Sequence, residues 1–229
     1  MICDFASSER SVTFSGKKRV TLVKQLSRFE RPKLKTHFLA LPPEDVYLRF
    51  GLAQNSAAII DYVEHIDFER DAVFGVYGDK LELIGVAHLA PQGEGAELGI
   101  SVLRGQRGRG VGTAIFSRAI EHARNLNLNN IFVHFLAENL VIRRLVRKLG
   151  LISVMRGSDS AASMALPPGN AGTVWNEWVD DCIALYDYSL KSQVELLKTQ
   201  TRPRKPHSLL YPSNDVKLSA ELADSNSSP

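Results

Sequence analysis

The feature that most constrains the fold of this chain is a basic, glycine-rich turn between an apolar strand and an amphipathic helix. The stretch covers residues 96–113 and reads AELGISVLRGQRGRGVGT. Residues 95–103 have the pattern of a β-strand, and glycines at 105, 108, 110 and 112 interrupt it. After the turn, apolar residues recur every four positions, at Val111, Ile115, Ala119 and Ala123. The pattern predicts a strand, a turn and a helix in direct succession.

A turn of this kind is suited to binding phosphate. Glycines permit positive φ angles and let the backbone approach a ligand closely. Several N–H groups can then converge on one anion at the positive end of the helix dipole. Arg104, Arg107 and Arg109 add positive charge around the turn. The stretch therefore predicts a site for a phosphate or a pyrophosphate.

The spacing of the glycines excludes two common phosphate-binding loops. A Walker A loop needs a lysine after Gly110, and none is present. Gly108, Gly110 and Gly112 are spaced G-x-G-x-G, so the Rossmann fingerprint G-x-G-x-x-G also fails. Arg107-x-x-Gly110-x-Gly112 does match R/Q-x-x-G-x-G/A. In this signature the chain resembles the GNAT (GCN5-related N-acetyltransferase) superfamily, whose members use it to bind acyl-coenzyme A.

A second interpretation of RGQRGRG is an arginine–glycine tract that binds RNA. Such tracts lie in low-complexity surroundings, whereas this one lies between a predicted strand and a predicted helix. It also lacks the periodic aromatic residues on which bases would stack. We therefore favour acyl-coenzyme A as the ligand and expect no nucleic-acid partner.

Composition limits the remaining possibilities. The chain has 229 residues, 44% of them hydrophobic and 23% charged, as in a soluble globular protein with one substantial domain. A net charge of +3 indicates neither nucleic acid nor an anionic membrane as partner. Cys3 and Cys182 lie far apart, which predicts no disulfide framework and no metal site. No stretch has the ~20 apolar residues of a membrane span, and the N-terminus lacks a leader pattern, so the expected location is the cytoplasm.

The segment before the turn predicts a strand, helices and a hairpin. Residues 19–24 (RVTLVK) are β-branched and predict a first strand, followed by a basic, proline-interrupted connection over 27–41. Two prolines and two acids then begin one or two helices between Asp45 and His65. Residues 71–77 and 81–90 predict an antiparallel hairpin that turns at 78–80. His88 lies on its second strand, where we expect a structural role.

The segment after the turn alternates strands and helices. Residues 131–136 predict a buried strand, and Asn139 predicts the N-cap of a helix that ends at Gly150. Residues 151–156 and 161–166 predict a closing hairpin. Apolar residues at helical spacing over 173–198 predict an added amphipathic helix. We expect its apolar face to cover the domain's own sheet, with a dimer contact or a lid over the acceptor groove as alternatives.

This order of elements is that of the GNAT fold, a mixed, mostly antiparallel α/β sheet with a central βαβ unit that binds acyl-CoA, here with an added C-terminal helix. The resemblance covers residues 19–166. It includes AENLVIRRLVRKLGL (137–151), which is similar to the superfamily's A-x-N-x-x-A/M…K-L-G-F segment. LPPEDVYLRFG (41–51) is also similar to the acetyltransferase domain of bacterial Pat-type protein lysine acetyltransferases. The expected organisation is a flexible lead-in (1–17), a GNAT acetyltransferase domain (18–168), a helical extension (172–198) and a disordered tail (199–229).

The resemblance implies an activity and a set of binding residues. GNAT enzymes move an acetyl group from acetyl-CoA to a primary amine, such as a protein lysine or a small amine, through a tetrahedral intermediate and without a metal. A bulge splays their central strand from its parallel neighbour, and the freed N–H groups hold the pantetheine arm. In this sequence the arm would bind Ile100, Ser101, Val102 and Leu103. The pyrophosphate would bind Arg107, Gly108, Arg109, Gly110, Val111, Gly112 and Thr113, with Asn139 contacting the cofactor from the next helix.

Glu97 matches the position at which histone-acetylating members of the superfamily carry their catalytic glutamate. A lysine amine has a pKa near 10.4 and must lose a proton before it can attack. The resemblance therefore implies that Glu97 is a general base; the alternative is that Glu97 is a structural residue of the strand. In many members a tyrosine seven residues after the helix asparagine protonates the leaving thiolate. Val146 occupies that position here. A catalytically weak acyl-CoA sensor, or a partner-binding module, is therefore the alternative function, and a homodimer is a further expectation.

Overall fold

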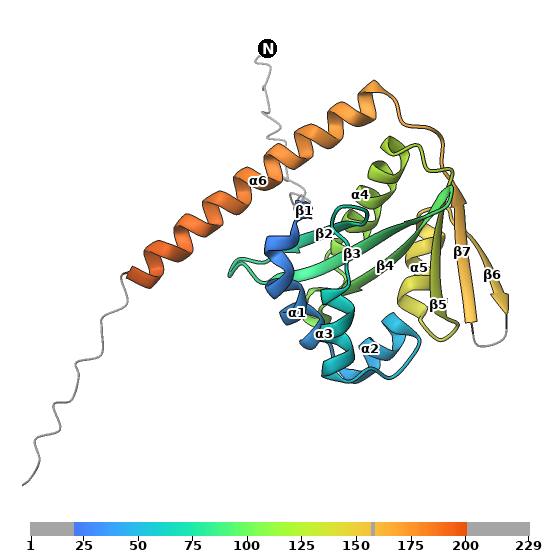
Figure 1. The fold of residues 1–229 in the computed structure, drawn as a ribbon, viewed down its shortest axis with the longest axis horizontal. Coiled ribbons are helices and arrows are strands. Elements are labelled where there is room, and N and C mark those ends of the chain that lie inside the picture. The colour runs from blue at the N-terminus through green and yellow to red at the C-terminus, as the bar shows by residue number, and fades with distance from the viewer. Residues whose placement is uncertain (1–20, 157–158, 201–229) are drawn as a thin grey trace, which may run out of the picture.

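The structure is a computed structural model that describes residues 21–156 and 159–200. It contains one seven-stranded sheet with the strand order β1-β2-β3-β4-β5-β7-β6 (Figure 1). The strands are β1 (Lys24–Leu26), β2 (Ala72–Tyr77), β3 (Leu83–Gln92), β4 (Gly95–Val102), β5 (Asn130–Leu136), β6 (Ile152–Arg156) and β7 (Asp159–Ala165). The helices are α1 (Arg31–Leu39), α2 (Pro43–Phe50), α3 (Ser56–Glu64), α4 (Val111–Asn125), α5 (Leu140–Lys148) and α6 (Ala171–Gln200), with 3₁₀ turns η1 (Arg28–Glu30) and η2 (Arg104–Gln106). All neighbouring strands are antiparallel except β4 and β5, which confirms the predicted fold class.

The two faces of the sheet carry separate hydrophobic cores. Side chains alternate along β3 and β4, so Leu89 and Leu98 join the core beneath α4 and α5. Val86 points to the other face and joins the core beneath α1, α2 and α3. His88 and its cross-strand partner Gly99 share that second face. The helices that precede β2 therefore cover the face that carries His88 and Gly99.

Most of the predicted elements are confirmed within one or two residues, and two predictions near the N-terminus are wrong. The strand expected at 19–24 is observed at 24–26, and residues 19–20 lie outside the described part of the chain. The expected connection over 27–41 instead forms η1 and α1. Ser27 and Glu30 form a reciprocal capping box, and Pro32 lies in the first turn of α1, where proline is compatible with a helix.

Helix α6 confirms the predicted added helix, but it packs through its polar side. Arg118 of α4 is buried and donates to the carboxylates of Glu177 (2.7 Å) and Asp181 (2.8 Å). Lys191 donates to the carbonyl oxygen of Tyr77. Ala184 of α6 is buried and Tyr188 packs against Tyr77. Most of the apolar side chains of α6 stay exposed, namely Val174, Trp175, Trp178, Cys182, Ile183, Leu185, Tyr186, Leu190, Val194, Leu196 and Leu197.

The prediction that the apolar face of α6 covers the domain's own sheet is therefore wrong. The ion pairs fix the opposite side of the helix against α4, and Figure 1 shows the C-terminal part of α6, in orange, running beyond the β1 edge of the sheet. The predicted lead-in and most of the predicted tail lie outside the described residues. In the part of the chain that the structure describes, no helix has the length and apolar character needed to cross a membrane.

Candidate functional site

The parallel strands β4 and β5 pair only at one end. Residues 95–97 pair with residues 130–132, and the strands then separate, although β4 continues to Val102 and β5 to Leu136. The bulge predicted in β4 is absent, because β4 stays in unbroken register with β3 and β5 with β7. Beyond residue 97, β4 stays paired with β3, and β5 stays paired with β7. Glu97 belongs to the last pair before the gap.

Two of the four residues predicted to bind the pantetheine arm present their N–H groups to this gap. The Leu103 N–H donates to the carbonyl oxygen of Ile84 at 3.0 Å and is not free. Because backbone groups alternate between the two edges of a strand, the Ser101 N–H also faces β3, whereas Ile100 and Val102 face the gap. Arg107 Nε donates to the Val102 carbonyl oxygen at 3.1 Å, as this alternation requires.

The glycine-rich turn leaves a run of backbone donors free. Among the described residues, the N–H groups of 108–113 have no protein acceptor, and α4 has no side-chain N-cap. Gly108 and Gly110 have φ angles of 75° and 88°, which side chains with a Cβ rarely adopt. Gly112 has no such constraint, and a Cβ there would be 3.7 Å from Leu145 and Val102. The turn is a concave set of N–H groups at a helix N-terminus, which suits an anion.

Two of the three arginines around the turn, Arg104 and Arg107, are held by α2, whereas Arg109 donates to Gln106 Oε1 within the turn at 3.2 Å. Arg107 Nη2 lies 2.9 Å from Asp45 Oδ2, and Arg104 Nε lies 3.1 Å from the same oxygen. Arg104 also pairs with the exposed Glu44 at 3.1 Å. The Asp45 side chain is 5% exposed. These contacts join the turn to the helix that precedes β2, a link that sequence analysis did not anticipate.

The structure places the other predicted residues as follows. Asn139 caps α5 by accepting from the Ile142 N–H (3.2 Å), and its amide donates to the Leu48 carbonyl oxygen of α2 (3.4 Å). Val146 is buried in the core, and its side chain has no proton to offer to a leaving thiolate. Glu97 is exposed and lines a cavity on the α1–α3 face.

Two cavities meet at α2. The smaller one, of about 160 Å³, lies beside the gap and the turn and is lined by Ile100, Val102, Gly108, Gly112 and Asn139. The larger one, of about 500 Å³, is lined by Glu97, His88 and Tyr62. Leu48 and Arg49 line both cavities. The arrangement can bring a ligand bound along β4 into contact with a second ligand in the larger cavity.

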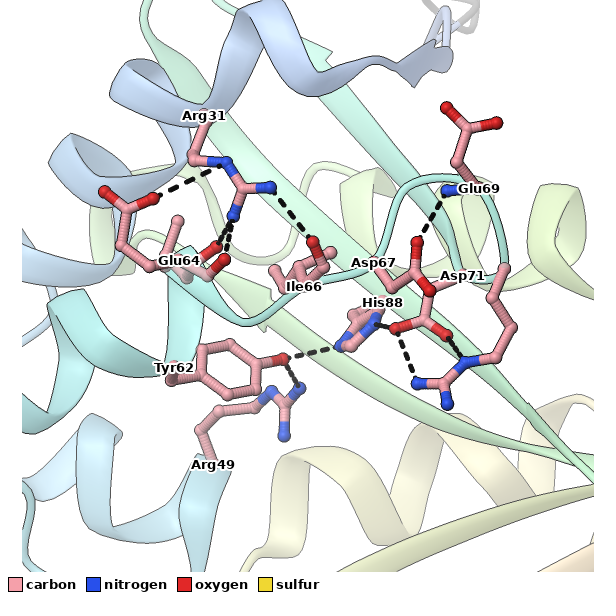
Figure 2. Close-up of polar contacts among 11 residues, drawn as sticks. Arg31, Arg49, Tyr62, Glu64, Ile66, Asp67, Glu69, Asp71 and His88 are labelled. Carbon is pink, nitrogen blue, oxygen red and sulfur yellow. Dashed lines mark hydrogen bonds and ion pairs between the residues drawn. The ribbon is translucent and has the colours of Figure 1, made fainter.

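Sequence reasoning missed a polar cluster in the larger cavity. Tyr62 of α3, His88 of β3, Arg49 of α2 and Asp71, which precedes β2, form a connected hydrogen-bond chain (Figure 2). The sequence predicts only a structural role for His88. The one available signal was its alternation with Val86, which places it on the face that α1–α3 cover. The partners come from separate segments and could not be read from spacing.

Burial and hydrogen bonding perturb these groups. Burial lowers the pKa of His88 below its ordinary value of 6.5, although its hydrogen bond to Asp71 acts in the other direction. Burial acts to raise the pKa of Asp71, but hydrogen bonds from Arg70 and His88 hold it below the ordinary value. Burial raises the pKa of Tyr62. At neutral pH the cluster therefore contains a neutral imidazole, an ionised carboxylate and a neutral phenol.

Comparison with known proteins agrees with this architecture. Residues 43–151 match the model of the acetyltransferase (GNAT) family. No curated protein matches the chain. Among solved structures, the GNAT domain of S. lividans PAT is 18% identical, with a TM-score of 0.56 and coverage of 63% of this chain and 89% of that one.

Two further structures are similar at the level of the fold. The ribosomal-protein-alanine N-acetyltransferase from Brucella melitensis is 17% identical, with a TM-score of 0.51 and coverage of 63% of this chain and 99% of that chain. The spermidine N-acetyltransferase from Vibrio cholerae, in complex with CoA and spermine, is 18% identical, with a TM-score of 0.50 and coverage of 62% and 94%.

Proposed function

Because this chain contains a domain of the GNAT acetyltransferase family, we propose that it transfers an acetyl group from acetyl-CoA to a primary amine, either a protein lysine or a small molecule. The observation that carries the proposal is the run of free N–H groups at 108–113, which lies at the end of the gap between β4 and β5. The free N–H groups suit a pyrophosphate, and the gap between β4 and β5 suits an extended arm that contains amide groups.

Each predicted binding residue has a specific part in this proposal. The N–H groups of Gly108 to Thr113 would bind the pyrophosphate, while the Arg107 side chain would keep the turn in place through Asp45. Ile100 and Val102 would pair with the pantetheine arm through their backbone. Asn139 would shape the cavity by holding α5 against α2. The thioester would then reach the junction of the two cavities.

Glu97 would act on the amine from the larger cavity. It stands on β4 at the last pair before the gap, on the face that carries His88. A carboxylate there can attract an ammonium group and serve as a base toward it. The relatives named above that act on spermidine and on a ribosomal-protein alanine support an amine acceptor as a class.

A second copy of the chain is the partner that fits the exposed face of α6. The face carries Trp175 and Trp178, whose ring centroids lie 5.1 Å apart, together with further exposed apolar side chains, and contiguous exposed apolar surface of this kind marks protein–protein contacts. The polar side of α6 is already bound to α4. Trp178→Glu is expected to convert a dimer to a monomer in light-scattering chromatography; a monomeric wild type would contradict this assignment.

The proposed activity is tested by release of free coenzyme A thiol from acetyl-CoA in the presence of a lysine peptide, spermidine or an alanine-terminated peptide. We expect turnover by the wild type with at least one amine, and loss of turnover in Gly110→Trp, where a bulky side chain would enter the turn. Reduced turnover in Glu97→Gln at unchanged acetyl-CoA affinity would support its action on the amine. Tight acetyl-CoA binding without turnover on any amine would favour a sensor instead.

A further inference from the structure

The polar cluster of the larger cavity forms one continuous chain of hydrogen bonds. Arg49 Nη2 donates to Tyr62 Oη at 3.2 Å, and this oxygen lies 2.7 Å from His88 Nδ1. His88 Nε2 lies 3.0 Å from Asp71 Oδ2 (Figure 2). Arg49, Tyr62 and His88 line the cavity, whereas the Asp71 side chain is only 3% exposed. This hydrogen-bond chain thus runs from the wall of the larger cavity to the buried carboxylate of Asp71.

The ionised carboxylate of Asp71 fixes the direction of these bonds. Asp71 also accepts from Arg70 Nε at 2.8 Å, and its lowered pKa keeps it unprotonated, so it can only accept from His88. His88 must therefore carry its proton on Nε2 and present a lone pair on Nδ1. Tyr62 donates its hydroxyl proton to that lone pair, while its oxygen accepts from Arg49. A proton that reaches the Tyr62 oxygen can pass along this chain to His88.

The hydrogen-bond chain lies next to the place where acetyl-CoA and the amine would meet. His88 of β3 lies opposite Gly99 of β4. The next residue, Ile100, directs its N–H group into the gap. Gly99 has no side chain, and a Cβ there would overlap the guanidinium of Arg49, which rests against β4. Arg49 lines both cavities. Among the described residues the buried Arg49 Nε has no hydrogen-bond partner. The contact of Arg49 with Gly99 puts this end of the hydrogen-bond chain against β4, at the junction of the two cavities.

Resting on the acetyl transfer proposed above, we infer that Tyr62 and His88 form the proton relay that deprotonates the acceptor amine, with Asp71 as a positioning residue. The ammonium group gives a proton to Tyr62 Oη while the phenolic proton moves to His88 Nδ1. The neutral amine attacks the thioester carbon, its lone pair forms the C–N bond, and the C–S bond breaks with its electron pair on sulfur. The second amine proton goes to this thiolate, and the imidazolium returns its proton to water.

Three charged groups face the relay from different elements: Arg49 from α2, Asp71 before β2 and Glu97 from β4. Asp71 stabilises the imidazolium that forms on His88, while Arg49 orients the phenol. Glu97 is exposed, and among the described residues it forms no hydrogen bond or ion pair that fixes it. Glu97 can attract the ammonium group, whereas the relay provides a proton acceptor, the Tyr62 oxygen, that is held in a fixed position.

The relay is tested by pH profiles of kcat and kcat/KM for Tyr62→Phe, His88→Gln, Asp71→Asn and Glu97→Gln, using the fastest amine of the panel above. Tyr47→Phe and His65→Gln, exposed positions outside both cavities, are the matched controls. We expect Tyr62→Phe and His88→Gln to lower kcat about 100-fold at pH 7 with unchanged acetyl-CoA affinity. The loss should shrink toward pH 10, because the free amine is then already deprotonated.

The outcomes separate the relay from the proposed function. Turnover with parallel pH profiles in wild type, Tyr62→Phe and His88→Gln would overturn the relay and leave the acetyl transfer standing, and a pH effect confined to Glu97→Gln would do the same. No turnover by the wild type on any amine would overturn both. Nitrogen-15 NMR of the imidazole gives a readout that needs no substrate: we expect a proton on His88 Nε2 and an Nδ1 shift that changes in Tyr62→Phe. A proton found on Nδ1 at neutral pH would overturn the relay.

Discussion

Arg107 Nη2 lies 2.9 Å from the buried carboxylate of Asp45, so a side chain of the glycine-rich turn is fixed to α2 rather than directed at a ligand. The same oxygen of Asp45 holds Arg104. The proposed binding by the turn therefore relies on its backbone N–H groups, while Arg104 and Arg107 fix its position. Because α2 also provides Arg49 to the larger cavity, the two halves of the site are joined through one helix.

Asp45→Asn is expected to tighten coenzyme A binding several-fold at low salt and to lower the melting temperature. The substitution removes a negative charge close to the predicted pyrophosphate site and weakens the link between turn and helix. Calorimetric titration with desulfo-coenzyme A at about 50 and 300 mM NaCl measures the effect, which should fade at the higher salt. Glu44→Gln changes the net charge equally at an exposed position and should have a smaller effect. Weaker binding by Asp45→Asn would contradict this account.

Gly112→Ala is expected to weaken acetyl-CoA binding about tenfold without loss of stability. A Cβ at this position makes only ordinary contacts at 3.7 Å within the protein, and alanine favours the helix. We therefore expect the added methyl group to clash with a bound ligand and not with the protein. Gly110→Ala should instead cost ~1–2 kcal/mol of stability, because φ is 88°.

Gly93→Ala is the matched control for backbone strain, since Gly93 has a φ of 59° in the β3–β4 turn away from both cavities. It should lower the melting temperature as Gly110→Ala does and leave binding unchanged. Chemical denaturation and acetyl-CoA titration of the three variants make the comparison. Unchanged binding in Gly112→Ala would place the ligand elsewhere.

The free energy of unfolding should fall between pH 6.5 and about pH 4 because of His37. The ring is 2% exposed; its Nδ1 donates to the Leu83 carbonyl oxygen (2.7 Å), and its Nε2 accepts from Ser101 Oγ (2.8 Å). Burial lowers the pKa of His37 from 6.5 to about 4. The folded state therefore favours the neutral ring, and protonation favours unfolding. Full stability is present above pH 6.5 and is lost as the pH falls, by up to ~3 kcal/mol.

Denaturation of the wild type and His37→Gln across this range isolates the effect of that histidine. His88 also has a lowered pKa, so the comparison rests on the difference between the two proteins. His37→Gln should be less stable at pH 7 and should show a shallower pH dependence. Equal slopes in the two proteins would mean that His37 is not kept neutral by the fold.

Arg118→Met is expected to destabilise the protein by ~3 kcal/mol and to release α6. The guanidinium is 4% exposed and pairs with Glu177 and Asp181, and its loss leaves both carboxylates without that cation. The side chain also lies over the ring of Phe74. Limited proteolysis within α6 and thermal unfolding report the two effects. Arg147→Met, on the exposed side of α5, should change neither.

The sequence predicts those features that depend on neighbouring residues. The spacing of Gly108, Gly110 and Gly112 indicates an anion-binding helix start, since backbone dihedral preferences and free N–H groups are local properties. Asn139 is confirmed as an N-cap for the same reason. Period-2 and helical patterns locate most strands and helices. The position of Glu97 on β4 follows from the same pattern, although its chemistry does not.

Tertiary structure decides which distant residues meet. Tyr62, His88 and Asp71 belong to three separate segments, and only the β2–β3 register and the packing of α3 bring them together. The sequence shows that α6 is amphipathic, but the buried Arg118 determines that its polar side faces the domain. The bulge predicted in β4 is absent: β4 and β5 each keep an unbroken ladder with an antiparallel neighbour and pair with each other only over residues 95–97 of β4. Local dihedral, capping and periodicity preferences are written in the sequence, whereas pairing across the fold depends on register and helix orientation, which short-range patterns do not encode.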